Sequence, residues 1–274
     1  MGHAMEILTF VTTCKGRLDA LKLTLGRMAG QAGCGCVVVD YSCPERVGDW
    51  VEANHPAVRV VRVEGREEFN LAAARNAGGR ATDAPWLCFV DADILLDESF
   101  AARVVPALVP GFYYRAPLTD GGVGGTCLCA RHDFERIGGY DEAYRAWGEE
   151  DNDLYDALGF IGIPPRMLPA GLLSHLPHDD DKRTQFYPVA DRVLGHAINR
   201  VYRILKWDTA RIRRELLTAE MRRALYHKVA EVVTESVRSS RPGDLAVHLP
   251  PGIVPGDRSL SRTLTYRLTG GGAG

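Results

Sequence analysis

The sequence has no apolar run that approaches the length of a membrane-spanning helix, and its first residues lack the pattern of a secretory signal. Its seven cysteines, an odd number, do not suggest a framework of paired disulfides. We therefore expect a cytoplasmic protein with reduced thiols. Two close pairs, Cys34 with Cys36 and Cys127 with Cys129, leave a zinc site open, but they lie in or beside apolar strand-like runs, which favours buried thiols.

The chain also has little net charge, only −2, but the charge is unevenly distributed. Residues 182–241 hold 14 Lys and Arg against 6 Asp and Glu, so an acidic body precedes a basic arm. An acidic body argues against nucleic acid as a substrate, because phosphate backbones need a basic surface. Apolar residues at helical spacing over 191–241 predict two amphipathic helices with arginine-rich outer faces. We expect them to form a cap on the sheet; contact with an anionic acceptor, self-association or peripheral attachment to a membrane stays open.

Strand-like and helix-like segments alternate along the first half of the chain. Apolar runs over 6–13, 36–40, 58–63 and 86–90 predict buried strands, with helical segments between them. Such alternation predicts an α/β fold with a mostly parallel sheet, flanked by helices. We expect a catalytic domain over 6–183, a helical extension over 184–241, and an irregular, partly disordered tail over 242–274.

Two carboxylates stand where one of these strands ends, in the stretch Phe89-Val90-Asp91-Ala92-Asp93. In an open α/β sheet, ligands bind at the carboxyl ends of the strands. Close acids repel one another unless a cation lies beside them, and such oxygen ligands suit Mg²⁺ or Mn²⁺. A simple polar turn is the alternative interpretation of Asp91 and Asp93.

A second block follows, with Gly138-Gly139-Tyr140-Asp141-Glu142 and then Trp147-Gly148-Glu149-Glu150-Asp151-Asn152-Asp153. Together with Gly124-Gly125, Arg75-Asn76 and the Asp91/Asp93 pair, it resembles the GT-A-fold glycosyltransferases of the family 2 superfamily. The likeness is to the galactosyltransferase branch, which includes β-1,4-galactosyltransferases and the catalytic domains of polypeptide N-acetylgalactosaminyltransferases. It extends from about Ile7 to Arg183. It implies a Rossmann-like GT-A fold.

The resemblance also implies a role for individual residues. Asp93 would hold the divalent metal, Asp91 would lie near the ribose or assist the metal, and Asp40 would contact uracil. The Arg75-Asn76 pair would touch the nucleotide or support the metal strand. The implied donor-binding residues are Thr12, Thr13, Arg17, Asp40, Arg75, Asn76, Asp91, Gly125 and Trp147.

Two histidines, His175 and His178, match late metal ligands of the family. Imidazole beside a carboxylate favours Mn²⁺ over Mg²⁺. Without the resemblance, two histidines near a polar segment are more often surface residues, so whether His175, His178 or both bind metal stays open.

The resemblance assigns Asp151 as the catalytic base, Glu150 as the acid that contacts donor or acceptor sugar, and Trp147 as a tryptophan that packs on the sugar. It implies metal-dependent, inverting transfer of a hexose or N-acetylhexosamine from a UDP-sugar to a hydroxyl of a carbohydrate, peptide or small molecule. Without it, Glu150 and Asp151 could be plain helix-terminus charges. Two other functions stay open: nucleotidyl transfer to a sugar phosphate, although Thr12 to Arg17 is a poor phosphate-binding loop, and a non-catalytic nucleotide-sugar binding module.

Overall fold

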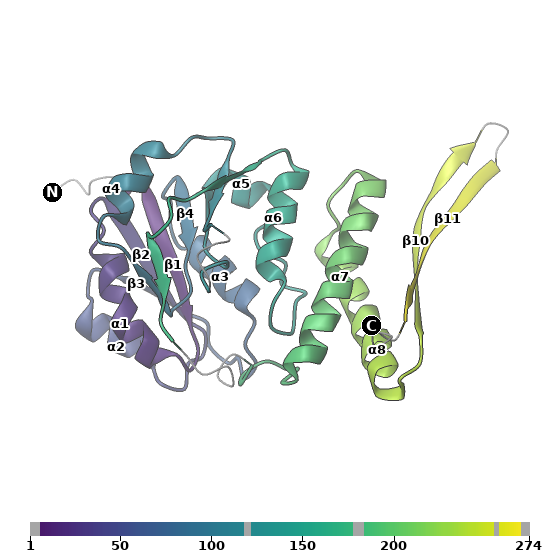
Figure 1. Cartoon of the computed structure of the whole chain (residues 1–274), viewed down its shortest axis with the longest axis horizontal. Helices are drawn as coiled ribbons and strands as arrows, with labels where there is room; N and C mark the ends of the chain where they lie inside the picture. Colours follow the sequence, from purple (N-terminus) through teal and green to yellow (C-terminus); the bar gives the residue numbers. More distant parts are fainter. Residues whose placement is uncertain (1–5, 118–121, 178–183, 255–257, 270–274) are drawn as a thin grey trace. The chain divides into compact units, whose positions relative to one another are not determined.

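The structure, a computed structural model, describes residues 6–117, 122–177, 184–254 and 258–269 (Figure 1). Within this range the chain forms two compact units. The first contains residues up to Glu142 together with Glu150–Pro188, and the second contains Ala143–Glu149 and the residues from Val189 onward. None of the described helices is long and apolar enough to cross a membrane.

A seven-stranded sheet forms the centre of the first unit, in the order β3-β2-β1-β4-β7-β6-β8. The first four strands in this order are parallel, whereas β7 runs antiparallel to β4 and β6. The prediction of a mostly parallel α/β sheet is therefore confirmed. The strands are β1 (Leu8–Cys14), β2 (Cys34–Asp40), β3 (Arg59–Arg62), β4 (Trp86–Phe89), β6 (Tyr113–Arg115), β7 (Cys127–Ala130) and β8 (Pro165–Met167).

Helices cover both faces of this sheet, because its central strands are apolar on both sides. Leu21 and Leu25 of α1 pack with Leu8 and Phe10 of β1 in one core cluster. On the other face, α3 approaches so closely that a β-carbon on Gly78 would collide with Val11. The helices of this unit are α1 (Leu18–Ala29), α2 (Val47–Asn54), α3 (Leu71–Gly79), α4 (Phe100–Val104), the 3₁₀ turn η1 (Val105–Ala107), α5 (Arg131–Arg136) and α6 (Glu150–Phe160).

Directly after β4 and Asp91-Ala92-Asp93, the chain forms a short strand, β5 (Ile94–Leu96). It pairs antiparallel with β9 (Leu173–His175), with Ile94 opposite His175. The backbone N–H of Leu176 donates to the carbonyl of Asp93 at 2.8 Å. This small second sheet brings His175 close to the chain that follows β4.

The second unit contains helices α7 (Arg192–Arg213) and α8 (Ala219–Ser239), which confirms the prediction of two helices over 191–241. Both begin at capping side chains: Asp191 accepts from two backbone N–H groups of α7, and Thr218 accepts from one of α8. Tyr202 of α7 and Tyr226 of α8 pack edge to face at a centroid distance of 5.1 Å, and both belong to the hydrophobic core of this unit.

The expectation of an irregular tail over 242–274 is wrong for its described part, which forms a two-stranded antiparallel hairpin (yellow in Figure 1). Its strands are β10 (Gly243–Val254) and β11 (Arg258–Leu268). The physical reason is an alternation of apolar residues in register, with Leu245 opposite Tyr266 and Val247 opposite Leu264. Leu245, Val247 and Tyr266 pack into the core of the second unit, and Pro and Gly residues in the tail had obscured this period-two pattern.

Candidate active site

The centre of the candidate site is a buried arginine. Arg75, whose side chain is only 2% exposed, extends from α3 toward the end of β4 and the start of α6. Its guanidinium donates to Oδ1 of Asp91 at 2.7 Å and to Oδ1 of Asp151 at 2.5 Å, and lies 3.6 Å from Oε1 of Glu150. One cation therefore joins the first acid after β4 to the two acids at the N-terminus of α6.

Three carboxylates around one guanidinium leave an excess of negative charge in a poorly solvated place. Burial raises the pKa of the Asp151 carboxyl well above its usual value, and Arg75 opposes that shift. Burial likewise raises the pKa of Glu150, again against the effect of Arg75. The side chain of Asp151 is 22% exposed, whereas that of Glu150 is 8% exposed. Asp151 is thus the more accessible of the two, and a stronger base than an ordinary aspartate.

Gly125 lies directly against these carboxylates. A β-carbon at this position would be 2.9 Å from Oδ2 of Asp151 and 3.1 Å from Oδ2 of Asp91. Tyr155 of α6 holds the segment that leads into β7, because its hydroxyl donates to the carbonyl of Gly124 at 2.9 Å. The backbone of the 124–126 segment therefore closes one side of the acid cluster, and a side chain at position 125 would displace a carboxylate.

Asn76, the neighbour of Arg75, has a supporting position. Its amide donates to the carbonyl of Tyr140 and to Glu142, and its oxygen accepts from the backbone N–H of Tyr140 at 2.8 Å. The ring of Tyr140 in turn lies 4.9 Å from the Arg75 guanidinium carbon. The Gly-Gly-Tyr-Asp-Glu motif thus packs against Asn76 and Arg75. A role of Asn76 in nucleotide binding stays a prediction.

The pairing of β5 with β9 places His175 opposite Ile94, so that the backbone of Asp93 and that of His175 are near one another. Oδ2 of Asp93 accepts from Arg17 at 2.8 Å, so the guanidinium provides positive charge at this carboxylate. A β-carbon on Gly122 would collide with the ring of His175, which places Gly122 beside this histidine. His178 lies outside the described residues.

A carboxylate and an imidazole are donor types that suit Mn²⁺, so the chemistry of Asp93 and His175 fits such an ion. In the described ranges, however, no three His, Cys, Asp or Glu side chains form a cluster that could hold a metal by themselves. The zinc site left open in the sequence is not formed either. Cys34 and Cys36 are on or beside β2, Cys127 and Cys129 are on β7, and β1 and β4 separate these strands.

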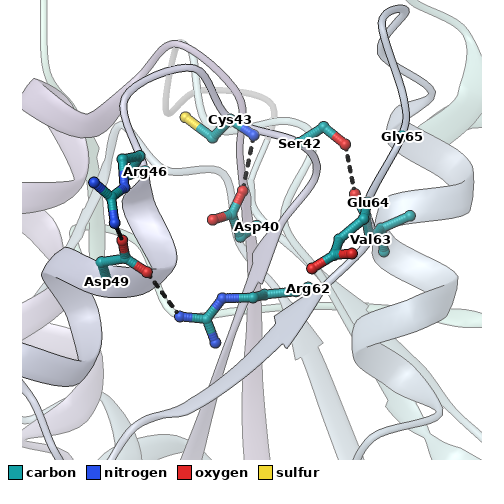
Figure 2. A pocket seen from close by; sticks show the side chains of 9 residues that line it. All are labelled: Asp40, Ser42, Cys43, Arg46, Asp49, Arg62, Val63, Glu64 and Gly65. Carbon is teal, nitrogen blue, oxygen red and sulfur yellow. Dashed lines mark hydrogen bonds and ion pairs between the residues drawn. The ribbon is translucent and has the colours of Figure 1, made fainter.

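Asp40 ends β2 at a cavity of about 400 Å³. Figure 2 shows its carboxylate between Ser42 and the network of Arg46, Asp49 and Arg62. Both Asp40 oxygens accept backbone N–H groups, from Cys43 at 2.8 Å and Gly48 at 2.9 Å. Asp40 therefore organises the loop that leads into α2, and its predicted contact with a nucleobase stays a prediction.

The turn after β1 contributes Lys15 to a neighbouring cavity of about 440 Å³, which Phe186 also lines in part. Lys15 donates to three backbone carbonyls, including that of Arg66 at 2.6 Å, and so ties the turn to the next loops. Thr12 and Thr13 lie buried on β1, and Oγ1 of Thr12 has no hydrogen-bond partner among the described residues.

Sequence reasoning missed an aromatic series next to Phe186, which lines the second cavity. Phe69 contacts Tyr41 and Tyr187, each at a centroid distance of 5.6 Å, and its N–H donates to the carbonyl of Phe186. The basic turn after β1 was a usable signal for Lys15. No local pattern marks Phe186 and Tyr187, because they are more than 110 residues away from Phe69 along the chain.

Trp147, assigned to the donor sugar, belongs to the second unit.

The chain is similar to known galactosyltransferases in part of its sequence. A family model described as the N-terminal domain of galactosyltransferase matches residues 110–179. This range contains Gly125, the Trp147–Asp151 block and His175, but not Asp91 or Asp93. Beta-1,4-galactosyltransferase 2 of Mus musculus is 27% identical over 184 residues, which cover 58% of this chain and 48% of that protein. The chain spans about half the length of the curated relatives it matches.

Solved structures extend the likeness. The mannosyltransferase PcManGT from Pyrobaculum calidifontis, in complex with GDP-Man and Mn²⁺, gives a TM-score of 0.57 at 16% identity, covering 85% of this chain and 75% of that chain. GalNAc-T7 with UDP, GalNAc and Mn²⁺ gives a TM-score of 0.54 at 13% identity, covering 87% of this chain and 58% of that chain. At these identities the likeness concerns the fold.

Proposed function

We propose that this chain, which has a galactosyltransferase-like GT-A fold, is a glycosyltransferase that moves a hexose or N-acetylhexosamine from a UDP-sugar to an acceptor hydroxyl. One observation carries the proposal: Asp91 from the end of β4 and Asp151 from the start of α6 share the buried Arg75 beneath Gly125. The carboxyl ends of the strands, where ligands bind in α/β folds, are thus close to the carboxylate assigned as the base.

Asp151 is the group that takes the proton from the attacking acceptor hydroxyl. Burial raises its pKa, which makes it a better base, and the bond to Arg75 fixes the direction of its carboxylate. A positioned side-chain base accelerates such a reaction by roughly 10²–10⁴-fold. With one base opposite the leaving group the reaction is a single displacement, and the anomeric configuration is inverted.

On the donor side, Asp93 and His175 would hold a divalent cation, with Mn²⁺ preferred. Once bound, that cation neutralises negative charge on the leaving diphosphate. Arg17 bonds to Asp93 and supplies positive charge at the same place. The structural neighbours crystallised with Mn²⁺ and with UDP or a GDP-sugar support both the metal and the nucleotide sugar.

A plain helix-terminus role for Asp151 accounts less well for this geometry. A surface carboxylate at a helix N-terminus contributes about 0.3–1 kcal/mol and needs no buried partner. Asp151 instead shares a guanidinium that is 2% exposed with the carboxylate of Asp91, which follows β4. Carboxyl groups with raised pKa values at a ligand-binding edge, as for Glu150 and Asp151, are typical of functional sites.

The proposal is tested by incubating the purified chain with a panel of UDP-sugars and Mn²⁺, and measuring UDP and inorganic diphosphate separately. We expect slow release of UDP from one UDP-sugar, accelerated by a carbohydrate, peptide or small-molecule acceptor and abolished by a chelator. Diphosphate as the product would instead identify a nucleotidyltransferase. Tight UDP binding without turnover in the presence of acceptors would identify a binding module.

A further inference from the structure

The segment 143–149, which leads directly into Glu150 and Asp151, is held by α7. The amide nitrogen of Asn199 donates to the carbonyl of Ala146 at 2.9 Å and to the carbonyl of Gly148 at 2.6 Å. Asn199 is completely buried. Its two amide hydrogens therefore fix the backbone on both sides of Trp147.

A tyrosine of α8 completes this network. The hydroxyl of Tyr226 donates to Oδ1 of Asn199 at 2.8 Å, and it accepts from the backbone N–H of Arg145 at 3.1 Å. Tyr226 thus determines which side of the Asn199 amide faces the loop. Because the bonds are buried and mutually dependent, the loss of one weakens the others.

Glu149 attaches the end of the same segment to α7. Its side chain is 2% exposed and lies 2.9 Å from Nε of Arg203, with Arg200 and His196 at 3.2 Å and 3.1 Å. Its backbone has a φ of +72°, which is unfavourable for a residue other than glycine. Such a conformation persists only where the surroundings hold it, and it occurs preferentially at functional sites.

The approach of the helix to the loop is itself specified. A β-carbon on Gly195 of α7 would be 2.9 Å from the β-carbon of Ala146, so glycine is needed for this contact. Beside it, the Arg192 guanidinium carbon lies 5.3 Å from the centre of the Trp147 ring. Bonds to backbone, ion pairs and close packing therefore all hold one segment of seven residues.

We propose that Asn199, oriented by Tyr226, is a positioning residue for sugar transfer. It fixes the 143–149 segment, which carries Trp147 and enters α6 at Glu150 and Asp151, so α7 and α8 act in the reaction as well as in folding. This inference rests on the proposed function. It implies that the second unit affects turnover while the binding of UDP with Mn²⁺, whose predicted residues belong to the first unit, is unchanged.

The test compares Asn199→Asp, which keeps the shape but removes both donated bonds, with Thr209→Val. Thr209 is also buried on α7, but its hydroxyl donates only to Leu205 within the helix. Hydrogen exchange of the 143–149 amides, measured by mass spectrometry without any ligand, should become at least about tenfold faster in Asn199→Asp and stay unchanged in Thr209→Val. Turnover of the UDP-sugar that wild type uses best should fall by about 10²-fold in Asn199→Asp, because small misplacements near the chemistry are costly.

Calorimetry of UDP with Mn²⁺ should give the same Kd for both variants and wild type. Tyr226→Phe, which loses only the hydroxyl, repeats the test should Asn199→Asp fail to fold, with a smaller change in the same direction. Unchanged exchange over 143–149, or wild-type turnover in a variant with accelerated exchange, would overturn the inference. Absence of turnover in wild type would instead contradict the proposed function, and the exchange result would still report on the positioning of the segment.

Discussion

Gly125 and Asp151 leave no room for a side chain between them: a β-carbon on the glycine would stand 2.9 Å from Oδ2 of the aspartate. A distance this short is essentially never tolerated by a real β-carbon next to a fixed atom. Asp151 is fixed because its other oxygen, Oδ1, is bound to Arg75. The backbone of one segment therefore limits where the carboxylate assigned as the base can lie.

The first prediction follows from this close approach. Gly125→Ala should displace Asp151 or Asp91 and lower turnover by about 10²-fold, because the displacement is near the reacting atoms. The adjacent Gly124→Ala is the matched control, since a β-carbon there would meet no atom within 4 Å. Turnover measured on both variants checks the prediction, and equal activities would contradict it.

The second prediction concerns stability. Arg75→Met removes the cation shared by Asp91, Glu150 and Asp151 and leaves buried negative charge. Breaking a buried ion pair costs about 3–5 kcal/mol, and we expect the low end because Asp91 is 41% exposed. Arg80→Met is the control, because the Arg80 side chain is 67% exposed and such a change costs within about 0.5 kcal/mol. Urea unfolding at pH 7 measures the free energy of unfolding of both variants. A loss of stability in Arg75→Met no larger than in Arg80→Met would contradict the role of Arg75 as the shared cation.

The third prediction concerns pH. A base accepts a proton only when it is ionised, so turnover should fall as the pH falls through the pKa of Asp151. Burial raises that pKa, and the acidic limb should lie well above about pH 4, the range of an ordinary aspartate. A rate profile against pH, at saturating donor, locates the limb. Constant turnover down to about pH 4 would show that no carboxyl with a raised pKa limits the reaction.

The fourth prediction concerns the hairpin. Leu245 of β10 is 2% exposed in the core of the second unit, whereas Leu260 of β11 is 55% exposed. Leu245→Ala should destabilise the protein by about 2–5 kcal/mol. The same change at Leu260 should stay within about 0.5 kcal/mol. Thermal unfolding of the two variants measures the difference; equal losses would mean that the base of the hairpin does not pack as described.

Local pattern was enough to predict the frame of the first unit. The runs that became β1, β2 and β4 are mostly apolar, and acids stand at the end of β2 and after β4, where parallel strands end. The helices α7 and α8 were predictable for the same reason, since their apolar residues recur at helical spacing.

The contacts that assemble the site were not predictable, because they join residues far apart in the sequence. Arg75 is 16 residues from Asp91 and 76 residues from Asp151, and no single-sequence pattern pairs them. The short strand β5 has only three residues and is defined by its pairing with β9 rather than by its composition. Asn199 bonds to Ala146 and Gly148, which are 53 and 51 residues away from it along the chain.

The central claim is that Asp151 is the base of a sugar transfer, distinct from the acid that supports the metal. Asp151→Asn keeps the shape and the helix position but removes the base. Asp93→Asn should instead weaken the binding of UDP in the presence of Mn²⁺. Both variants are compared with wild type by calorimetry of UDP with Mn²⁺.

The most direct measurement is the transfer rate of Asp151→Asn beside its affinity for UDP and Mn²⁺. We predict that affinity stays near the wild-type value while transfer falls by roughly two orders of magnitude or more. Near-normal transfer by Asp151→Asn would contradict the account; Asp151 would then be a helix-terminus charge, and Glu150 would be the next carboxylate to test.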